Sequence, residues 1–340
     1  MSGVNHQVRL AARPHGMLTP DAWELTEESL PSPAAGEVLV EVELLSLDPA
    51  MRGWLNVVPS YIPPVGIGEV MRAGGVGRVL SSADERFAEG DWVTATTGVQ
   101  EYALLDADAL TPIDTALAAP ETYLGALGIS GMTAYFGLLD VGRPEVGETV
   151  AVSGAAGSVG SIVGQIARIR GCRTVGIAGG PEKCAWLTGE LGFDAAVDYR
   201  AGDLRAGLKK AAPEGIDVFF DNVGGEILDA ALTRLSRGAR IVICGAISQY
   251  NAAEAGVGPS NYLSLLVKRA TMTGFVVFDH AGRYREAASE IAGWLADGSL
   301  IAREEVLDGG VAAFGRTLMR LFHGENTGKL VLRVGGAQTA

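Results

Sequence analysis

Basic residues and cysteines are both scarce in this sequence, and each shortage excludes a class of function. The 340 residues include 27 Lys and Arg against 40 Asp and Glu, which gives a formal net charge of −13. Nucleic acids and anionic membranes need basic patches, so we expect neither as a partner. The three cysteines, Cys172, Cys184 and Cys244, are too few for a disulfide framework, and we interpret them as reduced packing residues.

Long hydrophobic runs are also missing. No apolar segment approaches the length of about 18 residues that spans a bilayer. The first residues, MSGVNHQVRLAARP, lack the apolar core of a signal peptide. These absences predict a cytoplasmic protein without a membrane segment.

The first third of the chain has β character. At 340 residues, with 48% hydrophobic and 20% charged residues, the chain predicts about two domains. Apolar and polar residues alternate over residues 38–47 and 92–105, and glycines interrupt an apolar run over 66–80. Short strands with glycine corners predict a small barrel.

From residue 149 onward, strands and helices alternate. This order predicts an α/β domain with six strands in one parallel sheet and ligands at the carboxyl ends of the strands. Among the expected strands are 149–153, 174–178, 217–220, 239–244 and 271–278. The expected helices include 203–212, 226–236, 262–268 and 281–296.

The stretch between the first two of these strands predicts a dinucleotide site. A small-residue turn with Gly154, Gly157 and Gly160 follows an apolar strand and opens a helix. Glycines let the backbone approach a pyrophosphate, and the free N–H groups of the helix start attract the anion. Ala155 stands at the first position of the usual pattern. The alternative interpretation is a structural turn of another doubly wound protein.

The end of the second strand favours NADPH over NADH. NAD enzymes usually carry Asp or Glu there to hold the ribose hydroxyls, whereas this chain has Gly179 and Gly180. Lys183, at the start of the next helix, can meet a 2′-phosphate that a carboxylate would repel. The alternative is that Lys183 is an ordinary exposed helix residue.

Several segments together resemble one family over nearly the whole chain. They are SLDPAMRG (46–53), GMTAYFGLL (131–139), SGAAGSVGSIVGQIA (153–167), EKC (182–184), FDNVGG (220–225), CGAISQYN (244–251), GFVVFD (274–279) and NTGKL (326–330). The sequence resembles the zinc-independent medium-chain dehydrogenase/reductases. Within them it is most similar to the NADPH-dependent alkenal double-bond reductases, which include prostaglandin and curcumin reductases.

The resemblance implies a fold and a cofactor site. The fold would be a Rossmann doubly wound parallel sheet, residues 125–300, inserted into a GroES-like β-barrel domain formed by 1–124 and 301–340. NADPH would be bound at its pyrophosphate by Gly157, Ser158, Val159 and Gly160, and at its 2′-phosphate by Gly179, Lys183 and Tyr199. The remainder would contact Asn222, Cys244, Gly245, Ala246, Ile247, Ser248, Tyr250, Phe275, Val276, Val277 and Asn326.

The resemblance also implies a reaction, in which hydride reaches the β-carbon of an α,β-unsaturated aldehyde or ketone. Tyr250 would hold the oxygen that gains charge, because a phenol is a hydrogen-bond donor at neutral pH. The alternative is an aromatic lid on the cofactor. Many family members have a tyrosine at the substrate pocket where this chain has Ala50. The alternatives are a roomier pocket at Ala50 or a different substrate residue, Tyr61 or Tyr262.

Zinc is not expected, although zinc alcohol dehydrogenases share this architecture. They hold the metal through Cys, His and a carboxylate in the barrel domain. Here the barrel half contains no cysteine, and Glu69 follows Gly68 where the zinc enzymes have histidine.

There are two alternative functions, and one partner is expected. A zinc-free quinone reductase uses the same fold, and a non-catalytic NADPH-binding protein would keep the same cofactor residues. By resemblance, we expect a homodimer paired through the sixth strand, residues 270–278.

Overall fold

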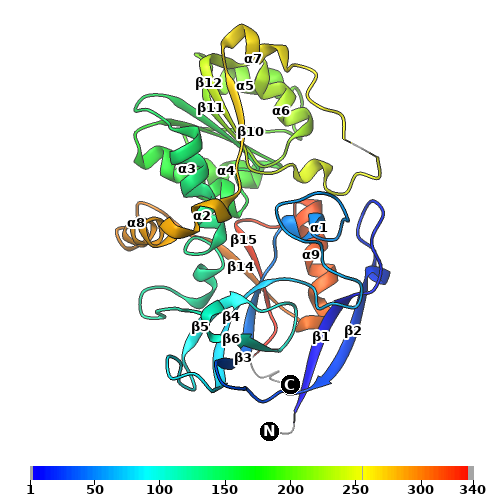
Figure 1. Cartoon of the computed structure of the whole chain (residues 1–340). Coiled ribbons are helices and arrows are strands. Elements are labelled where there is room, and N and C mark those ends of the chain that lie inside the picture. Colours follow the sequence, from blue (N-terminus) through cyan, green and yellow to red (C-terminus); the bar gives the residue numbers. More distant parts are fainter. Residues whose placement is uncertain (1–2, 255, 336–340) are drawn as a thin grey trace. The chain divides into compact units, whose positions relative to one another are not determined.

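The computed structural model describes residues 3–254 and 256–335, and it contains two compact units (Figure 1). The first unit takes the residues up to Gly125 together with those from Glu304 onward, and the second takes Ala126–Arg303. The sequence-based boundaries lay after residues 124 and 300. The outermost ends of the expected domains, residues 1–2 and 336–340, lie outside the described residues.

One β-sheet of seven strands lies at the centre of the first unit's fold. Six of its seven strands are arranged in the order β14-β15-β3-β4-β5-β7, and the seventh, β6, pairs with β3 outside this order. Their bounds are β3 Glu37–Ser46, β4 Gly74–Ser82, β5 Trp92–Thr96, β6 Tyr102–Asp106, β7 Thr111–Pro112, β14 Glu304–Asp308 and β15 Lys329–Arg333. Since β15 pairs with β3, the C-terminal segment completes the sheet that the N-terminal segment begins.

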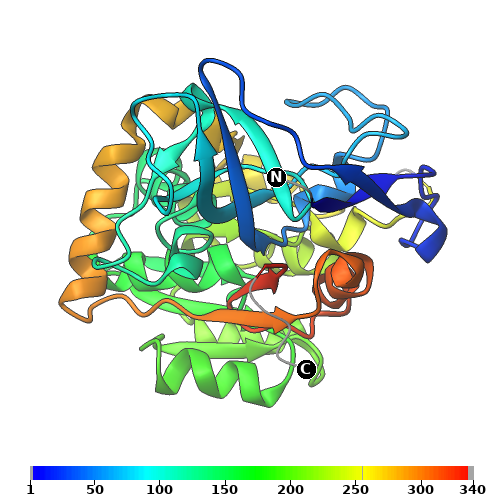
Figure 2. The same cartoon turned by 90° about the horizontal axis from the view of Figure 1, so that it is seen from below.

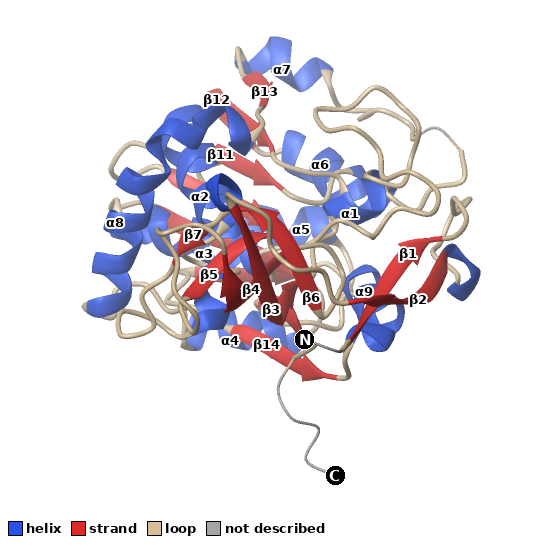
Figure 3. Ribbon diagram, turned by 60° about the horizontal axis from the view of Figure 1, so that its bottom comes forward, coloured by secondary structure: helices blue, strands red, loops and turns tan. Residues whose placement is uncertain are grey.

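A separate antiparallel hairpin and two helices complete this unit. The hairpin consists of β1 (Val4–Leu10) and β2 (Trp23–Ser29), and the helices are α1 (Ala50–Gly53) and α9 (Phe314–His323). Figure 3 shows α9 beside the hairpin, where the rings of Trp23 and Phe314 meet edge to face with centroids 5.1 Å apart.

The expected strand over 66–80 forms only from Gly74 onward. The Glu69 amide donates to the Gly66 carbonyl at 3.1 Å, and the Glu69 carboxylate accepts from the Gly66 amide at 2.8 Å. Gly68 between them has φ of +81°, a left-handed conformation that glycine adopts readily. A tight turn therefore replaces the first half of the expected strand.

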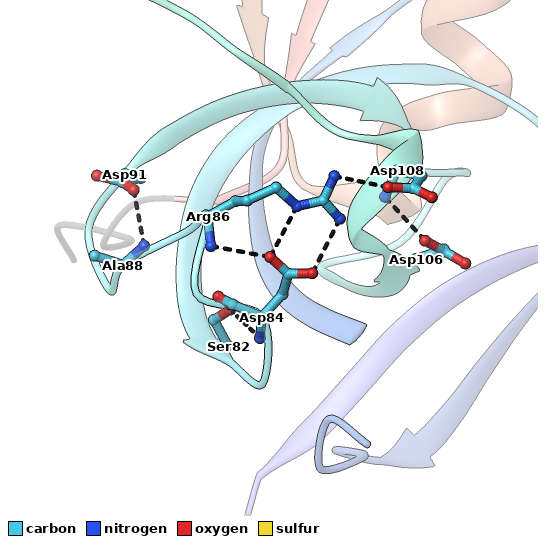
Figure 4. A network of polar contacts seen from close by, with 7 residues as sticks. All are labelled: Ser82, Asp84, Arg86, Ala88, Asp91, Asp106 and Asp108. Atoms are coloured by element: carbon cyan, nitrogen blue, oxygen red, sulfur yellow. Dashed lines mark hydrogen bonds and ion pairs between the residues drawn. The ribbon is translucent and has the colours of Figure 1, made fainter. Parts of the chain in front are cut away.

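A polar cluster closes the turn between β4 and β5 (Figure 4). The Arg86 guanidinium contacts Asp84 at 2.9 Å and Asp108 at 2.7 Å, and the Asp84 carboxylate also accepts from the Arg86 amide. These hydrogen bonds lower the pKa of Asp84 to about 2. The cluster ties the turn to the segment that follows β6, and it lies at the surface, where such pairs stabilise little.

The second unit is a doubly wound α/β domain, as expected. Its six strands are parallel and ordered β10-β9-β8-β11-β12-β13. The strands are β8 Thr149–Ser153, β9 Arg173–Ala178, β10 Ala195–Asp198, β11 Ile216–Asp221, β12 Leu235–Ile243 and β13 Thr271–Gly274. The helices are α2 Ile129–Phe136, α3 Ser158–Ile169, α4 Pro181–Gly189, α5 Leu204–Ala211, α6 Gly225–Leu232, α7 Leu263–Lys268 and α8 Tyr284–Ala296.

Helices cover both faces of this sheet (Figures 1 and 2). Val150 and Val152 of β8 pack in a core with residues of α2, α3, α4 and α8. Ala151, between them, packs in a second core with residues of α5 and α6. Because successive strand residues point to opposite faces, an all-apolar strand of this kind must be buried on both sides.

Two expected elements end earlier in the structure than the sequence indicated. The strand expected over 271–278 stops at Gly274. A 3-10 helix begins at Val277, and the Phe275 ring between them packs on Phe220 at a centroid distance of 6.4 Å. The helix expected over 226–236 stops at Leu232, because buried Leu235 already pairs with Ile216 in the sheet. Within the described chain, the helices are all too short or too polar to cross a membrane.

Candidate dinucleotide-binding site

The turn between β8 and α3 forms a close-packed cradle. Gly154 has φ of +58°, and its carbonyl accepts the Gly157 amide at 2.9 Å. A Cβ on Gly160 would lie 2.4 Å from the Gly154 carbonyl oxygen and 2.8 Å from the Ala155 Cα. Only glycine at position 160 therefore allows the first turn of α3 to approach the loop this closely.

The first turn of α3 is suited to an anion. Gly157 at the N-cap has no side chain to satisfy the first amides of the helix, which have no intrahelical acceptors. Among the described residues, Ser158 Oγ is buried and has no hydrogen-bond partner. These donors fit a bound pyrophosphate, because helix N-termini favour negative charge.

The ends of β9 and β10 meet at Gly179. A Cβ there would lie 2.8 Å from the Tyr199 hydroxyl and 2.9 Å from Arg200 Nε, so both side chains rest against the glycine backbone. Lys183 lies in the first turn of α4. The structure thus brings the expected residues Gly179 and Tyr199 together.

Sequence reasoning missed Arg200. Its guanidinium carbon lies 5.5 Å from the centroid of the Tyr199 ring, within the range of a cation–π contact. The only signal in the sequence was a basic residue directly after the expected Tyr199.

Asp221 organises the carboxyl ends of β8 and β11. Its Oδ1 accepts from Ser153 Oγ at 2.7 Å and from the amides of Val223 and Gly224 at 3.1 and 3.0 Å. Burial raises the pKa of this carboxyl above its usual range. Asn222, expected at the cofactor, donates its side-chain amide to the Ser153 carbonyl at 2.7 Å. The loop after β11 is therefore held in one conformation.

The segment after β12 is hydrogen-bonded to the end of β11. The amides of Cys244 and Gly245 both donate to the Asp221 carbonyl, at 2.9 and 3.1 Å. Burial raises the pKa of Cys244 to about 12, so its thiol stays protonated at neutral pH. The amides of Ile247 and Ser248 donate to the carbonyls of Asn222 and Val223 in the loop after β11, both at 3.2 Å.

Tyr250 folds back over this segment. Its hydroxyl oxygen accepts the Ala246 amide at 3.2 Å, and a Cβ on Gly245 would approach it to 2.9 Å. Tyr250 thus lies over the Gly245–Ala246 peptide, beyond the end of β12.

Phe275, Val276 and Val277 follow β13. The Phe275 ring packs so closely on Gly137 that a Cβ there would lie 2.5 Å from its Cζ. Val277 is buried, and its carbonyl accepts the Tyr284 hydroxyl at 3.0 Å.

The remaining expected residues are placed less specifically. Tyr262 in the second unit and Tyr61 in the first have 59% and 57% of their surface exposed. Asn326 is buried in the first unit and donates its side-chain amide to the Gly328 carbonyl at 2.9 Å. Ala50 opens the short helix α1.

An ion pair with a buried lysine lies close to Ala50 in the sequence, and sequence reasoning missed it. Lys329 Nζ, with 2% of its side chain exposed, lies 2.6 Å from Asp48 Oδ1. Ser46 donates its hydroxyl to the other oxygen of the same carboxylate. The pair fixes the segment before Ala50 to the start of β15.

Two family models match the chain. One describes the N-terminal domain of oxidoreductase and matches residues 6–113, and the other describes zinc-binding dehydrogenase and matches residues 158–293. The NADPH-dependent curcumin reductase of Escherichia coli (strain K12) is 43% identical over 337 residues, which cover 98% of this chain and 97% of that protein. The chain belongs to the medium-chain dehydrogenase/reductase family. The resemblance of the sequence motifs is thereby confirmed.

Other members of the family extend the comparison. The 2-alkenal reductase (NADP(+)-dependent) of Nicotiana tabacum is 40% identical over 308 residues, with 88% of each chain covered. A crystal structure of CurA from Vibrio vulnificus in complex with NADPH has a TM-score of 0.92 and 42% identity, and it covers 98% of this chain and all of its own. The expected fold, a Rossmann domain with a GroES-like domain, is that of this family. Although one family model is named for zinc, the described residues contain no group of three or more His, Cys, Asp and Glu that could hold a metal ion.

Proposed function

We propose that this family member is an NADPH-dependent reductase that saturates the C=C bond of α,β-unsaturated aldehydes and ketones. The observation that carries the proposal is the end of β9. Glycine replaces the usual acid there, and a tyrosine hydroxyl and a guanidinium rest on it. The proposal is supported by the curcumin and 2-alkenal reductases to which the chain is 43% and 40% identical.

We assign the contacts to NADPH to the predicted residues of the second unit. In our proposal, the amides at Gly157, Ser158, Val159 and Gly160 bind the pyrophosphate, and Gly179, Lys183 and Tyr199 surround the 2′-phosphate. Asn222, the segments 244–248 and 275–277, and Tyr250 contact the remainder. When bound, NADPH supplies the hydride, and the protein supplies alignment and electrostatics.

Tyr250 is the proposed electrophilic residue. Hydride addition to an enone leaves charge on the carbonyl oxygen, and a positioned donor stabilises that charge in a site from which water is excluded. A phenol can donate one hydrogen bond while it accepts another. The Ala246 amide occupies an acceptor position on the Tyr250 oxygen and thereby orients the hydroxyl.

The proposed substrate residues are those that the sequence indicated, Ala50 and Tyr61 in the first unit and Tyr262 in the second. The methyl group of Ala50 takes little room, so bulky substituents on the enone are expected to fit. The two tyrosines present amphipathic rings suited to an apolar substrate with one polar group.

The test is NADPH oxidation with a graded panel of enals and enones and a benzoquinone, using the wild type and Tyr250→Phe. We expect turnover with enones, and about a tenfold to hundredfold lower kcat for the variant, because one donor to the developing charge is lost. The NADPH Kd should stay within about twofold.

The other outcomes identify the alternatives. Turnover with benzoquinone alone indicates a quinone reductase, and binding without any turnover indicates a non-catalytic NADPH-binding protein. An unchanged kcat in Tyr250→Phe removes the role assigned to the phenol.

A further inference from the structure

Arg200 lies where the ends of two neighbouring strands converge, and nothing in the sequence motifs assigns it a role. We propose that Arg200 is a second cationic ligand of the cofactor's 2′-phosphate and that Asp198 is the residue that positions it. This inference deepens the proposed function and rests on it, since it assumes that the ligand is a 2′-phosphorylated dinucleotide.

The guanidinium is held at the end of β9 by its neighbours. Arg200 Nε lies 2.9 Å from the point that a Cβ of Gly179 would occupy, and the Tyr199 hydroxyl lies 2.8 Å from the same point. The Tyr199 ring packs beside the guanidinium, with 5.5 Å between Arg200 Cζ and the ring centroid. Both polar groups therefore lie over Gly179, the position from which NAD enzymes direct a carboxylate to the ribose.

Asp198 joins the two loops that carry these groups. Its Oδ1 accepts the amide of Gly180, after β9, and the amide of Arg200, after β10, both at 2.9 Å. These two hydrogen bonds lower the pKa of the carboxyl. Because one oxygen receives both amides, the carboxylate sets the position of Arg200 relative to Gly179.

Charge and space both favour a phosphate ligand here. A phosphate monoester carries a charge of about −1.5 to −2 at pH 7, more than the Lys183 ammonium alone neutralises. A guanidinium adds two parallel N–H donors that match phosphate oxygens. A side chain at position 179 would displace both Tyr199 and Arg200, so Gly179 provides room for these ligands in addition to removing a negative charge.

The experiment measures NADP+ and NAD+ binding to the whole protein by calorimetry. Arg200→Gln is compared with Arg205→Gln, which removes the same charge from an exposed residue of α5. We expect Arg200→Gln to weaken NADP+ binding about tenfold and to leave NAD+ binding within about twofold. Arg205→Gln should change neither by more than about twofold, and Arg200→Lys should fall between the wild type and Arg200→Gln.

The outcomes separate this inference from the proposed function. If the wild type binds NAD+ as tightly as NADP+, the proposed cofactor preference fails. If the wild type prefers NADP+ and Arg200→Gln behaves like Arg205→Gln, the preference stands and the role of Arg200 is wrong.

Asp198 is tested by rescue. Asp198→Ala removes the shared acceptor and should reduce the preference for NADP+ over NAD+ at least about threefold. Asp198→Asn keeps an oxygen that can accept both amides and should restore the preference. If Asp198→Ala loses affinity equally for both nucleotides, or if Asp198→Asn does not restore the preference for NADP+, the positioning role is overturned.

Discussion

Replacing Gly160 by alanine tests the cradle between β8 and α3. The added Cβ would lie 2.4 Å from the Gly154 carbonyl oxygen and 2.8 Å from the Ala155 Cα. Both are backbone atoms, which cannot rotate aside as a side chain can. The start of α3 must therefore move away from the loop by about 1 Å to reach ordinary contact distance.

Two energies of opposite sign compete in this variant. Alanine is favoured over glycine in a helix by at most about 1 kcal/mol, whereas overpacking costs about 1–3 kcal/mol. We expect the overpacking to win, so that Gly160→Ala lowers the free energy of unfolding by about 1–2 kcal/mol. The moved amides should also weaken NADP+ binding about tenfold, because they no longer converge on the pyrophosphate.

Gly293→Ala is the matched control. Gly293 lies inside α8, in the same unit, and a Cβ there meets no atom within 4 Å. The same substitution should stabilise the protein by about 0.5–1 kcal/mol and leave NADP+ binding unchanged. Urea denaturation and calorimetry on both variants decide the matter. If Gly160→Ala is stabilised as Gly293→Ala is and binds NADP+ like the wild type, the reasoning about the cradle is wrong.

Three further results are expected. Burial raises the pKa of Glu304 from 4.5 to about 7, so the stability linked to its proton is fully present below about pH 4.5 and is lost as pH rises toward 7. Between pH 5 and pH 8, urea denaturation should show that the wild type loses at most about 3 kcal/mol of its free energy of unfolding, and Glu304→Gln should lack this loss. An equal loss in the two proteins would contradict the prediction. Asp221→Ala should destabilise by about 2–4 kcal/mol, because three donors lose their acceptor, and Asp221→Asn should cost less than half as much. The edge position of β13 is compatible with strand pairing between two copies, and we expect sedimentation to show a dimer; particles of single-chain mass would exclude it.

Local pattern predicted the elements that carry the dinucleotide site. The strand 149–153 is apolar at its centre, and α3 carries the apolar residues Ile162, Val163 and Ile166 at helical spacing. Together they have one stable placement, as a strand buried on both faces with a helix across it. The glycine-rich turn between them was correctly located for the same reason.

Contacts across the sheet were harder to predict. Arg200 meets Gly179 only because β10 lies in parallel register beside β9, with Asp198 opposite Ala178, and no local periodicity encodes that register. The Lys329–Asp48 ion pair joins residues 281 positions apart. The end of β13 was missed because the apolar run continues to Phe278, whereas the chain already enters a 3-10 helix at Val277.

The most direct test of the proposed function is a product analysis of one enone reduced with NADPH and with NADH. We expect the saturated carbonyl compound, with kcat/KM for NADPH at least about a hundredfold above that for NADH. An allylic alcohol as the product, or equal rates with the two cofactors, would contradict the account.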